Sequence, residues 1–330
     1  MKIFDFCNNE TEFVVTILNK KFIYKKIDDI YESIFLYWNN KGIDNNLISK
    51  LEMLYFNPKY HHKKYKKLWL IYATCLLKIN QEQNALKVLQ NYVNEFGYIH
   101  IEKFIPLAWL ANKYNITSAN IKLSAELFEL FENKKNWLDY IKDKKIAIVG
   151  NGANLIGKNM GNEIDKHEVV IRFNQFKTTG FENDCGKKTN MWVTHTTLKE
   201  ENFINNFDYI ILNYQYWNNI IEPERLKNIV GTNKNIGFID FDSKKHTKNL
   251  LMNDFYEPTT GCALICKLLE NLKDFDNIDF YGFGFLDKKF KPLDHYYQKV
   301  SKRHQQKAEI MHSFSKECSF LKDLVSKNKK

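Results

Sequence analysis

Arginine is scarce in this chain of 330 residues. It occurs only at Arg172, Arg225 and Arg303, so the formal net charge of +10 comes from lysine. The excess is spread evenly, with +4 over residues 1–140 (19 basic, 15 acidic) and +6 over residues 141–330 (30 basic, 24 acidic). Proteins that read nucleic acid usually cluster their positive charge and use arginine forks for bidentate contacts. We therefore expect no specific nucleic-acid site.

Paired cysteines are missing too. The chain has six cysteines, and no two of them form a Cys-x-x-Cys pair. Cys262 and Cys266 would share one face of a helix, but no histidine or third cysteine stands nearby at the spacing of a zinc site. A structural zinc site is therefore not expected, and the scattered thiols are typical of a reduced, cytoplasmic protein.

Long apolar runs are also absent. No stretch approaches the ~18 residues that a membrane-spanning helix needs, and no signal peptide opens the chain. The lysine-rich segment 61–67 offers one route to an anionic membrane surface, although a solvated helix end is the favoured interpretation. We expect a cytoplasmic location, with peripheral contact at the inner membrane as an alternative.

Apolar mass is plentiful, since 44% of the residues are hydrophobic and 15% are aromatic, which is enough for a large core. From residue 67 to residue 93, apolar side chains recur every three or four positions, and they do so again over 104–110 and 121–131. This period is typical of amphipathic helices. We expect residues 1–140 to form an all-α helical annex of stacked antiparallel helix pairs.

Residues 141–330 have a different texture. Short apolar runs alternate there with helical or loop segments, which is typical of an α/β fold with a mostly parallel sheet. We therefore divide the chain into the helical annex (1–140) and an α/β domain (141–330). The expected strands are 146–149, 168–173, 191–194, 209–212, 236–239 and 278–281.

The first of these strands runs into Gly150-Asn151-Gly152. Glycines at this point let backbone N–H groups approach a phosphate closely, and a helix N-terminus favours anions. A dinucleotide fingerprint would need glycine where Leu155 stands, and no Lys-Ser or Lys-Thr pair follows to complete a Walker loop. The loop indicates a nucleotide but disfavours NAD. A tight turn without a ligand is the alternative interpretation.

From Ile146 onward, four motif segments follow one another. Read together, they resemble the animal-type sialyltransferases, glycosyltransferase family 29. No single segment is decisive, but the ordered set is specific, and it covers residues 146–330. The segments are Val149-Gly150-Asn151 through Arg172-Phe173-Asn174-Gln175 to Thr189; Pro258-Thr259-Thr260-Gly261 with Tyr281-Gly282-Phe283-Gly284; His295-Tyr296-Tyr297-Gln298; and His312 to Glu317.

The resemblance implies a Rossmann-like, mostly parallel sheet flanked by helices, as in a variant GT-A fold. It also implies the transfer of sialic acid from CMP-sialic acid to a glycan hydroxyl, with inversion at the anomeric carbon. In a bacterial cytoplasmic member this reaction would serve surface polysaccharide or lipooligosaccharide synthesis. The family's secreted members carry a disulfide where Ile146 and Phe275 stand here, so the bridge is absent.

The resemblance further assigns residue roles. His312 is the expected base for the acceptor hydroxyl, with Glu317 orienting it or capping a helix, and His295 is expected beside the leaving phosphate. Arg172 is either a clamp for the sialate carboxylate or, as we favour, the partner of a buried acid such as Asp184. The residues expected to bind the donor are Gly150, Asn151, Asn174, Thr259, Thr260, Gly261 and Tyr296.

A metal is not expected, and neither is any other cofactor. Asp240-Phe241-Asp242 and Asp274-Phe275-Asp276 both spell the Asp-x-Asp pattern that some sugar transferases use to hold Mg²⁺ or Mn²⁺. Both lie outside the matched motifs, and a CMP-sugar carries only one phosphate. We expect metal-independent transfer.

Three other functions stay open on the sequence alone. The donor could be another CMP-ulosonic acid such as Kdo. The chain could instead be a helical interaction module that carries an inactive transferase domain, although His295, His312, Asn151 and Asn174 are all present. An NAD-dependent oxidoreductase is disfavoured by Leu155.

Overall fold

The structure is a computed structural model, and every statement below concerns the residues it describes. These are residues 4–8, 12–17, 20–25, 30–133, 136–195, 207–213, 217, 220–231, 233, 235–239, 258–272, 275–286, 295–296 and 314–329.

The chain begins with three strands, which corrects the expectation of an all-α annex. β1 (Phe4–Asn8), β2 (Glu12–Ile17) and β3 (Lys20–Lys25) form an antiparallel sheet in the order β1-β2-β3. The sequences of β2 and β3, EFVVTI and KKFIYK, are rich in the β-branched and aromatic residues that favour strands. The helical period that supported the expectation begins only at residue 67.

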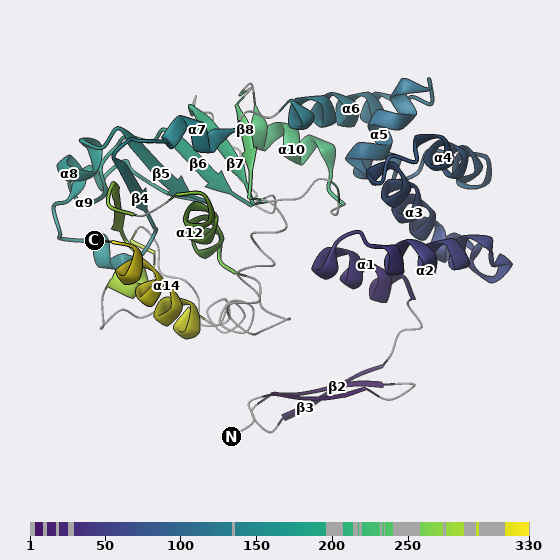
Figure 1. Cartoon of the computed structure of the whole chain (residues 1–330), viewed down its shortest axis with the longest axis horizontal. Helices are drawn as coiled ribbons and strands as arrows, with labels where there is room; N and C mark the ends of the chain where they lie inside the picture. The colour runs from purple at the N-terminus through teal and green to yellow at the C-terminus, as the bar shows by residue number, and fades with distance from the viewer. Residues whose placement is uncertain are drawn as a thin grey trace.

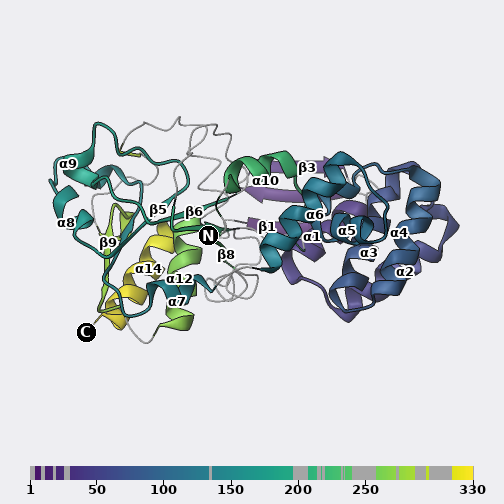
Figure 2. The ribbon, with the colours of Figure 1, turned by 90° about the horizontal axis from the view of Figure 1, so that it is seen from above.

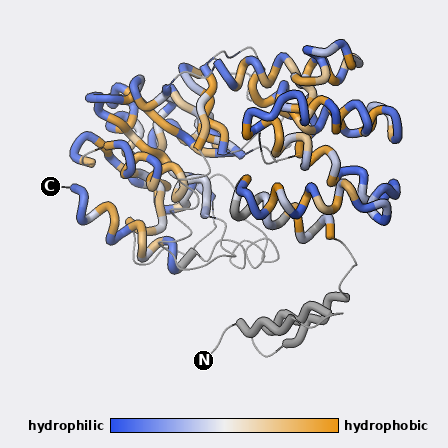
Figure 3. Tube along the Cα trace, turned by 45° about the vertical axis from the view of Figure 1, so that its right-hand side comes forward, coloured by the Kyte–Doolittle hydropathy of each residue, from blue (hydrophilic) through white to orange (hydrophobic). Residues whose placement is uncertain are grey.

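Helices make up the rest of the annex, as expected. Short polar turns separate them, and hydrophobic and hydrophilic stretches alternate along them in Figure 3. α3 is buried from Leu68 to Leu77, whereas α4 buries one face, so α3 is the centre of this layer. The helices are α1 (Ile30–Lys41), α2 (Asn45–Phe56), α3 (Lys66–Lys78), α4 (Glu82–Phe96), α5 (Ile105–Lys113), α6 (Ala119–Glu132) and α7 (Trp137–Ile141), with 3-10 turns at Pro58–Tyr60, Lys63–Tyr65 and Ile101–Lys103.

A six-stranded sheet follows, and all its neighbouring strands are parallel, which confirms the predicted α/β fold. The order is β8-β7-β6-β5-β4-β9, so the chain steps from β4 to β8 in one direction and then returns to pair β9 with β4. The strands are β4 (Ile146–Val149), β5 (Val169–Phe173), β6 (Met191–Thr194), β7 (Tyr209–Leu212), β8 (Ile236–Phe238) and β9 (Ile278–Tyr281).

Helices cover both faces of this sheet (Figures 1 and 2). On one face, side chains such as Ile148 and Ile171 share a core cluster with α7, α12 (Thr260–Asn271) and α14 (Phe314–Asn328). On the other face, Val149 and Val170 pack near α8 (Gly161–Asp165) and α9 (Glu182–Cys185), while β6 to β8 pack on α10 (Pro223–Val230) and α6. Burial on both faces explains why the strands are short apolar runs.

The core is continuous across the annex boundary placed at residue 140. Phe131 of α6 is fully buried and meets Phe238 of β8 edge to face at 5.1 Å between ring centroids. Trp137 of α7 belongs to the cluster beneath the sheet, and its Nε1 donates to the Phe238 carbonyl at 3.3 Å. The packing therefore continues across residue 140, where the helices give way to the strands of the sheet.

Candidate active site

The carboxyl ends of the parallel strands gather the motif segments at one edge of the sheet. Open α/β sheets bind ligands at this edge, close to the point where the strand order reverses. Here the reversal lies between β4 and β9, because the chain leaves β4 towards β5 and comes back to β9. The loops that follow β4 and β9 contain the predicted Gly150-Asn151-Gly152 and Tyr281-Gly282-Phe283-Gly284 segments.

The two glycine segments lie against each other. The N–H of Gly150 donates to the Tyr281 carbonyl at 2.7 Å, and the N–H of Gly152 donates to the Gly282 carbonyl at 2.9 Å. A Cβ at Gly150 would stand only 2.6 Å from the Gly282 oxygen. This corrects one part of the sequence interpretation: these two glycines allow close contact between loops, and their N–H groups are used there instead of facing a phosphate.

The third motif forms the next layer of the edge. His295 makes an antiparallel bridge with Gly152, and the N–H of Tyr296 donates to the Asn151 carbonyl at 3.0 Å. His295 is half-buried. The predicted leaving-group residue thus lies beside the predicted nucleotide loop, although 143 positions separate His295 from Gly152 in the chain.

Tyr296 is a core residue, which corrects its assignment to the donor site. Only 6% of it is exposed, and its ring packs edge to face on Phe181. Its hydroxyl donates to the Lys177 carbonyl at 2.7 Å and accepts from the Lys177 N–H at 3.2 Å. Burial raises the pKa of this hydroxyl. Tyr296 therefore fixes the loop after β5 and does not face a ligand.

Asn151 holds the backbone on both sides of Asn174. The Asn151 amide donates to the carbonyls of Phe173 (3.0 Å) and Gln175 (2.8 Å), which flank Asn174. Asn151 therefore positions the backbone, and its N–H groups are not the donor contacts that the sequence suggested. Asn174 itself has a left-handed φ of 47°, and its Oδ1 accepts from the His195 N–H at 3.3 Å. Among the described residues its Nδ2 has no partner, so this group is available to a ligand.

Thr259 precedes α12 directly, and Thr260 and Gly261 are the first two residues of that helix. Thr259 is the N-cap, and its Oγ1 accepts from the Cys262 N–H at 3.2 Å. A Cβ on Gly261 would stand 3.0 Å from the ring of Phe283, whose other edge is 3.3 Å from the equivalent point on Gly150. Phe283 therefore joins the start of α12 to the loop after β4. The partial positive charge of this helix N-terminus lies at the same edge of the sheet.

Glu317 has a role that the sequence did not reveal. It lies in the first turn of α14 and is only 4% exposed. Its carboxylate accepts from the Thr259 hydroxyl and, at 3.1 Å, from the Thr259 N–H. The last motif is thereby tied to the second one. His312, the predicted base five residues earlier, lies outside the described residues, as do Asp240, Asp242 and Asp274.

Two polar residues at this edge were not among the site residues predicted from the sequence. His195 and Asn213 directly follow β6 and β7, and Asn213 Nδ2 contacts Thr260 Oγ1 at 3.4 Å. The Asn213 Oδ1 is buried without a partner among the described residues. Their position in the sequence could have identified them, because both residues stand immediately after predicted strands and the carboxyl ends of parallel strands share one edge.

Arg172 has the structural role favoured from sequence, but with other partners. It is fully buried, and its guanidinium donates to the carbonyls of Cys185 (2.7 Å) and Lys188 (3.1 Å) and to Thr189 Oγ1 (3.0 Å). Asp184 instead accepts from the Asn159 N–H at 2.9 Å. Arg172 thus holds the segment between β5 and β6 in place.

Three further observations concern the predicted disulfide positions, metal ligands and membrane helices. Ile146 and Phe275, the positions at which the resemblance implies a disulfide in secreted members, are both buried in the hydrophobic cluster that contains α12. Among the described residues, no three His, Cys, Asp or Glu side chains lie together as metal ligands would. No described helix is long and apolar enough to cross a bilayer.

Comparison with known proteins identifies curated relatives. The human CMP-N-acetylneuraminate-beta-1,4-galactoside alpha-2,3-sialyltransferase is 31% identical over 98 residues, which are 30% of this chain and 25% of that protein. The mouse alpha-N-acetylgalactosaminide alpha-2,6-sialyltransferase 2 is 27% identical over 241 residues, covering 60% of this chain and 63% of that protein. The matches therefore span less than two thirds of these relatives.

A solved structure is similar as well, a mammalian sialyltransferase in complex with Gal-beta-1-3GalNAc-ortho-nitrophenol. It matches with 22% identity and a TM-score of 0.46 over 68% of this chain and 83% of that one. The sequence profile of glycosyltransferase family 29 (sialyltransferase) matches residues 99–329, and so begins within the annex. That match covers well over half of the chain, and the chain therefore belongs to glycosyltransferase family 29, the sialyltransferase family.

Proposed function

We propose that this protein is a metal-independent sialyltransferase that moves sialic acid from CMP-sialic acid to a glycan hydroxyl with inversion at the anomeric carbon. We further propose that it acts in the bacterial cytoplasm, in contact with the inner membrane, in the synthesis of a surface polysaccharide or lipooligosaccharide. Membership of family 29 supports the first proposal. The second rests on the sequence alone.

One observation carries the proposal: the motif segments converge on a single sheet edge, where Asn174 keeps an unused amide donor. Asn151 and His195 hold Asn174 from two sides. A nucleotide phosphate or ribose at this edge would find a neutral donor, the N-terminus of α12 and His295 close together. This set of groups suits a monophosphate leaving group better than a metal-bound diphosphate.

The proposed donor and these residues define the following reaction. The acceptor oxygen attacks C2 of the sialic acid, the bond from C2 to the phosphate oxygen breaks, and CMP departs with the bonding electrons. The hydroxyl proton passes to His312, whose neutral imidazole is a competent base near neutral pH. His295 would stabilise the charge that builds up on the departing phosphate.

The test is a transfer assay with CMP-sialic acid against a panel of glycans, combined with calorimetric binding of CMP. His312→Ala should lower the transfer rate ~10²–10⁴-fold while CMP affinity stays within a few-fold, whereas Asn174→Ala should weaken CMP binding. Asn115→Ala is the matched control, because Asn115 is exposed and also has a left-handed φ, of 60°. Wild-type turnover and CMP affinity in both site variants would exclude the assigned roles.

Two alternatives are separated by the same assay. Transfer from CMP-Kdo in preference to CMP-sialic acid would identify another CMP-ulosonic acid as the donor. A protein that neither cleaves CMP-sialic acid nor binds CMP would be an interaction module.

Transfer should also be unchanged by EDTA, and loss of activity that Mn²⁺ restores would contradict metal independence.

A further inference from the structure

The helical annex contains a pocket that the transfer reaction does not use. It has a volume of about 400 Å³ and lies between α2, the 3-10 turns that follow it, α3 and α4. Figures 1 and 2 both place these helices at the opposite end of the molecule from β4 and β9. The pocket is therefore separate from the candidate active site. Its lining residues are Tyr55, Phe56, His61, Trp69, Asn91, Asn94 and Glu95.

Aromatic rings form a rigid wall of this pocket. Trp69 is 6% exposed and belongs to the annex core. The rings of Tyr55 and His61 contact it edge to face, with centroids 4.9 Å and 5.0 Å away. Phe56, next to Tyr55, is 70% exposed, which is unusual for so large an apolar side chain. The wall thus combines the packed rings of Tyr55, His61 and Trp69 with the solvent-exposed ring of Phe56.

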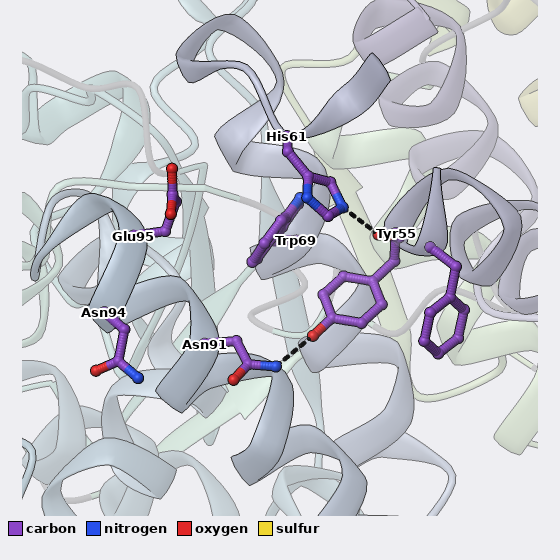
Figure 4. A pocket seen from close by; sticks show the side chains of 7 residues that line it. Tyr55, His61, Trp69, Asn91, Asn94 and Glu95 are labelled. Carbon is purple, nitrogen blue, oxygen red and sulfur yellow. Dashed lines mark hydrogen bonds between the residues drawn. The ribbon is translucent and has the colours of Figure 1, made fainter. Parts of the chain in front are cut away.

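Polar side chains of α4 lie to one side of these rings (Figure 4). Asn91 Nδ2 donates to the Tyr55 hydroxyl at 2.8 Å, which leaves the Asn91 Oδ1 and the hydroxyl proton of Tyr55 available. His61 Nε2 donates to the Tyr55 carbonyl at 2.7 Å, so in the neutral ring Nδ1 is an acceptor. Asn94 and Glu95 have no partner among the described residues, and both are exposed on α4.

We propose that this pocket binds a neutral pyranose unit of a glycan. A pyranose presents C–H groups on one face, which pack on the negative face of an aromatic ring, and hydroxyls around its rim, which both donate and accept hydrogen bonds. The pocket offers ring surfaces together with amide, carboxylate, hydroxyl and imidazole groups. Its size is also within the usual range of small-ligand sites.

Two other ligand classes fit less well. An apolar side chain of a peptide would make no hydrogen bond to the amide of Asn94 or the carboxylate of Glu95. A quaternary ammonium group requires several ring faces turned to one point. Here the rings of Tyr55 and His61 are each packed edge to face against Trp69. The groups that line the pocket therefore favour a sugar.

The experiment follows the indole N–H resonances of the full-length protein, which has six tryptophans. With ¹⁵N-labelled tryptophan, the Trp69 signal is assigned from the Trp69→Phe variant. The probes are methyl β-galactopyranoside, lactose and methyl α-glucopyranoside at millimolar concentrations, with CMP and tetramethylammonium as comparison ligands. We expect at least one sugar to shift the Trp69 signal saturably, and CMP to leave it unchanged.

The double variant Asn94→Ala/Glu95→Gln should bind that sugar about tenfold more weakly, since it loses several hydrogen bonds. Gln90→Ala is the matched control, because Gln90 is exposed on the same helix outside the pocket and should bind as wild type does. No shift with any sugar would overturn the proposal, as would unchanged binding in the double variant or a shift with tetramethylammonium alone. Because the signal comes from the annex, the result does not depend on whether the sheet edge transfers sialic acid.

Discussion

The carboxylate of Glu317 satisfies two donors of one residue, the N–H and the hydroxyl of Thr259. Both partners are at least half-buried, and they belong to the N-termini of α12 and α14. A carboxylate in this position keeps the start of α14 next to the start of α12. Glu317 therefore serves to hold these two helix N-termini together.

Glu317→Ala should therefore lower the free energy of unfolding by about 1–3 kcal/mol, because it leaves the Thr259 donors without an acceptor. Urea denaturation measures this loss. Asp323→Ala, on an exposed position of the same helix, is the control and should change stability by less than ~0.5 kcal/mol. Equal effects of the two substitutions would exclude the proposed link.

At the residue scale, the fold brings several of the predicted site residues together but turns some of their side chains elsewhere. His295, Asn174 and Thr259 all lie at the carboxyl edge of the sheet. Tyr296 does not face it, because its hydroxyl is bound by Lys177, which is 119 positions away. No local pattern reports a partner at that separation. A motif shows that residues are needed together, whereas burial decides which of them meet a ligand and which hold the others.

At the scale of elements, α4 and α5 are joined at their ends by Glu82. Its carboxylate accepts from Lys113 Nζ at 2.8 Å and 2.9 Å and from the Tyr114 hydroxyl at 2.7 Å. The hydrogen bond from Lys113, followed by that from Tyr114, lowers the pKa of Glu82. A carboxyl whose pKa is lower in the folded state stabilises the fold above its unfolded pKa and loses this contribution as pH falls through the folded value.

Replacing Glu82 by Gln should accordingly reduce stability at neutral pH but not in acid. We expect the difference in the free energy of unfolding between wild type and the variant to be small and constant above pH ~5 and to vanish towards pH ~3. Denaturation curves recorded across this range measure it. Glu126→Gln, an exposed position on α6, is the control without such a pH dependence. A difference that grows in acid would contradict the assignment.

The strands of the α/β domain were predicted nearly to the residue, and those at the N-terminus were not. β4 and β7 are buried and continuously apolar, and β5, β6, β8 and β9 are mostly apolar and at least half-buried. β1 to β3 mix charged and apolar residues within five or six positions, as in KKFIYK, and such short segments have no distinctive period. Mostly apolar composition is what made β4 to β9 recognisable in the sequence.

At the scale of the whole molecule, the annex and the sheet share a hydrophobic core. Phe131, Phe128 and Leu127 of α6 belong to the same cluster as Trp192 and Ile210 of the sheet. The family profile also begins at residue 99, within the annex. Side chains of α5 and α6 therefore pack in one cluster with the sheet.

Phe131→Ala should lower the free energy of unfolding by about 3–5 kcal/mol, the usual cost of removing a fully buried phenylalanine. We expect circular dichroism and tryptophan fluorescence to give coincident unfolding transitions in wild type and variant, since one core connects both regions. Phe56→Ala, at an exposed position of α2, is the control with little loss of stability. Two separate transitions in the wild type would show independent units.

The return of β9 to the side of β4 has a consequence for synthesis of the protein on the ribosome. Strands β4 to β8 emerge first, yet β4 at that moment has an unpaired edge, because its second neighbour consists of residues 278–281. An exposed apolar edge invites pairing with other nascent chains. The start of α14, which carries Glu317, emerges later still. The candidate site is thus assembled only after residue 317 has emerged, and a chain that stopped before β9 would lack part of this site and leave the edge of β4 unpaired.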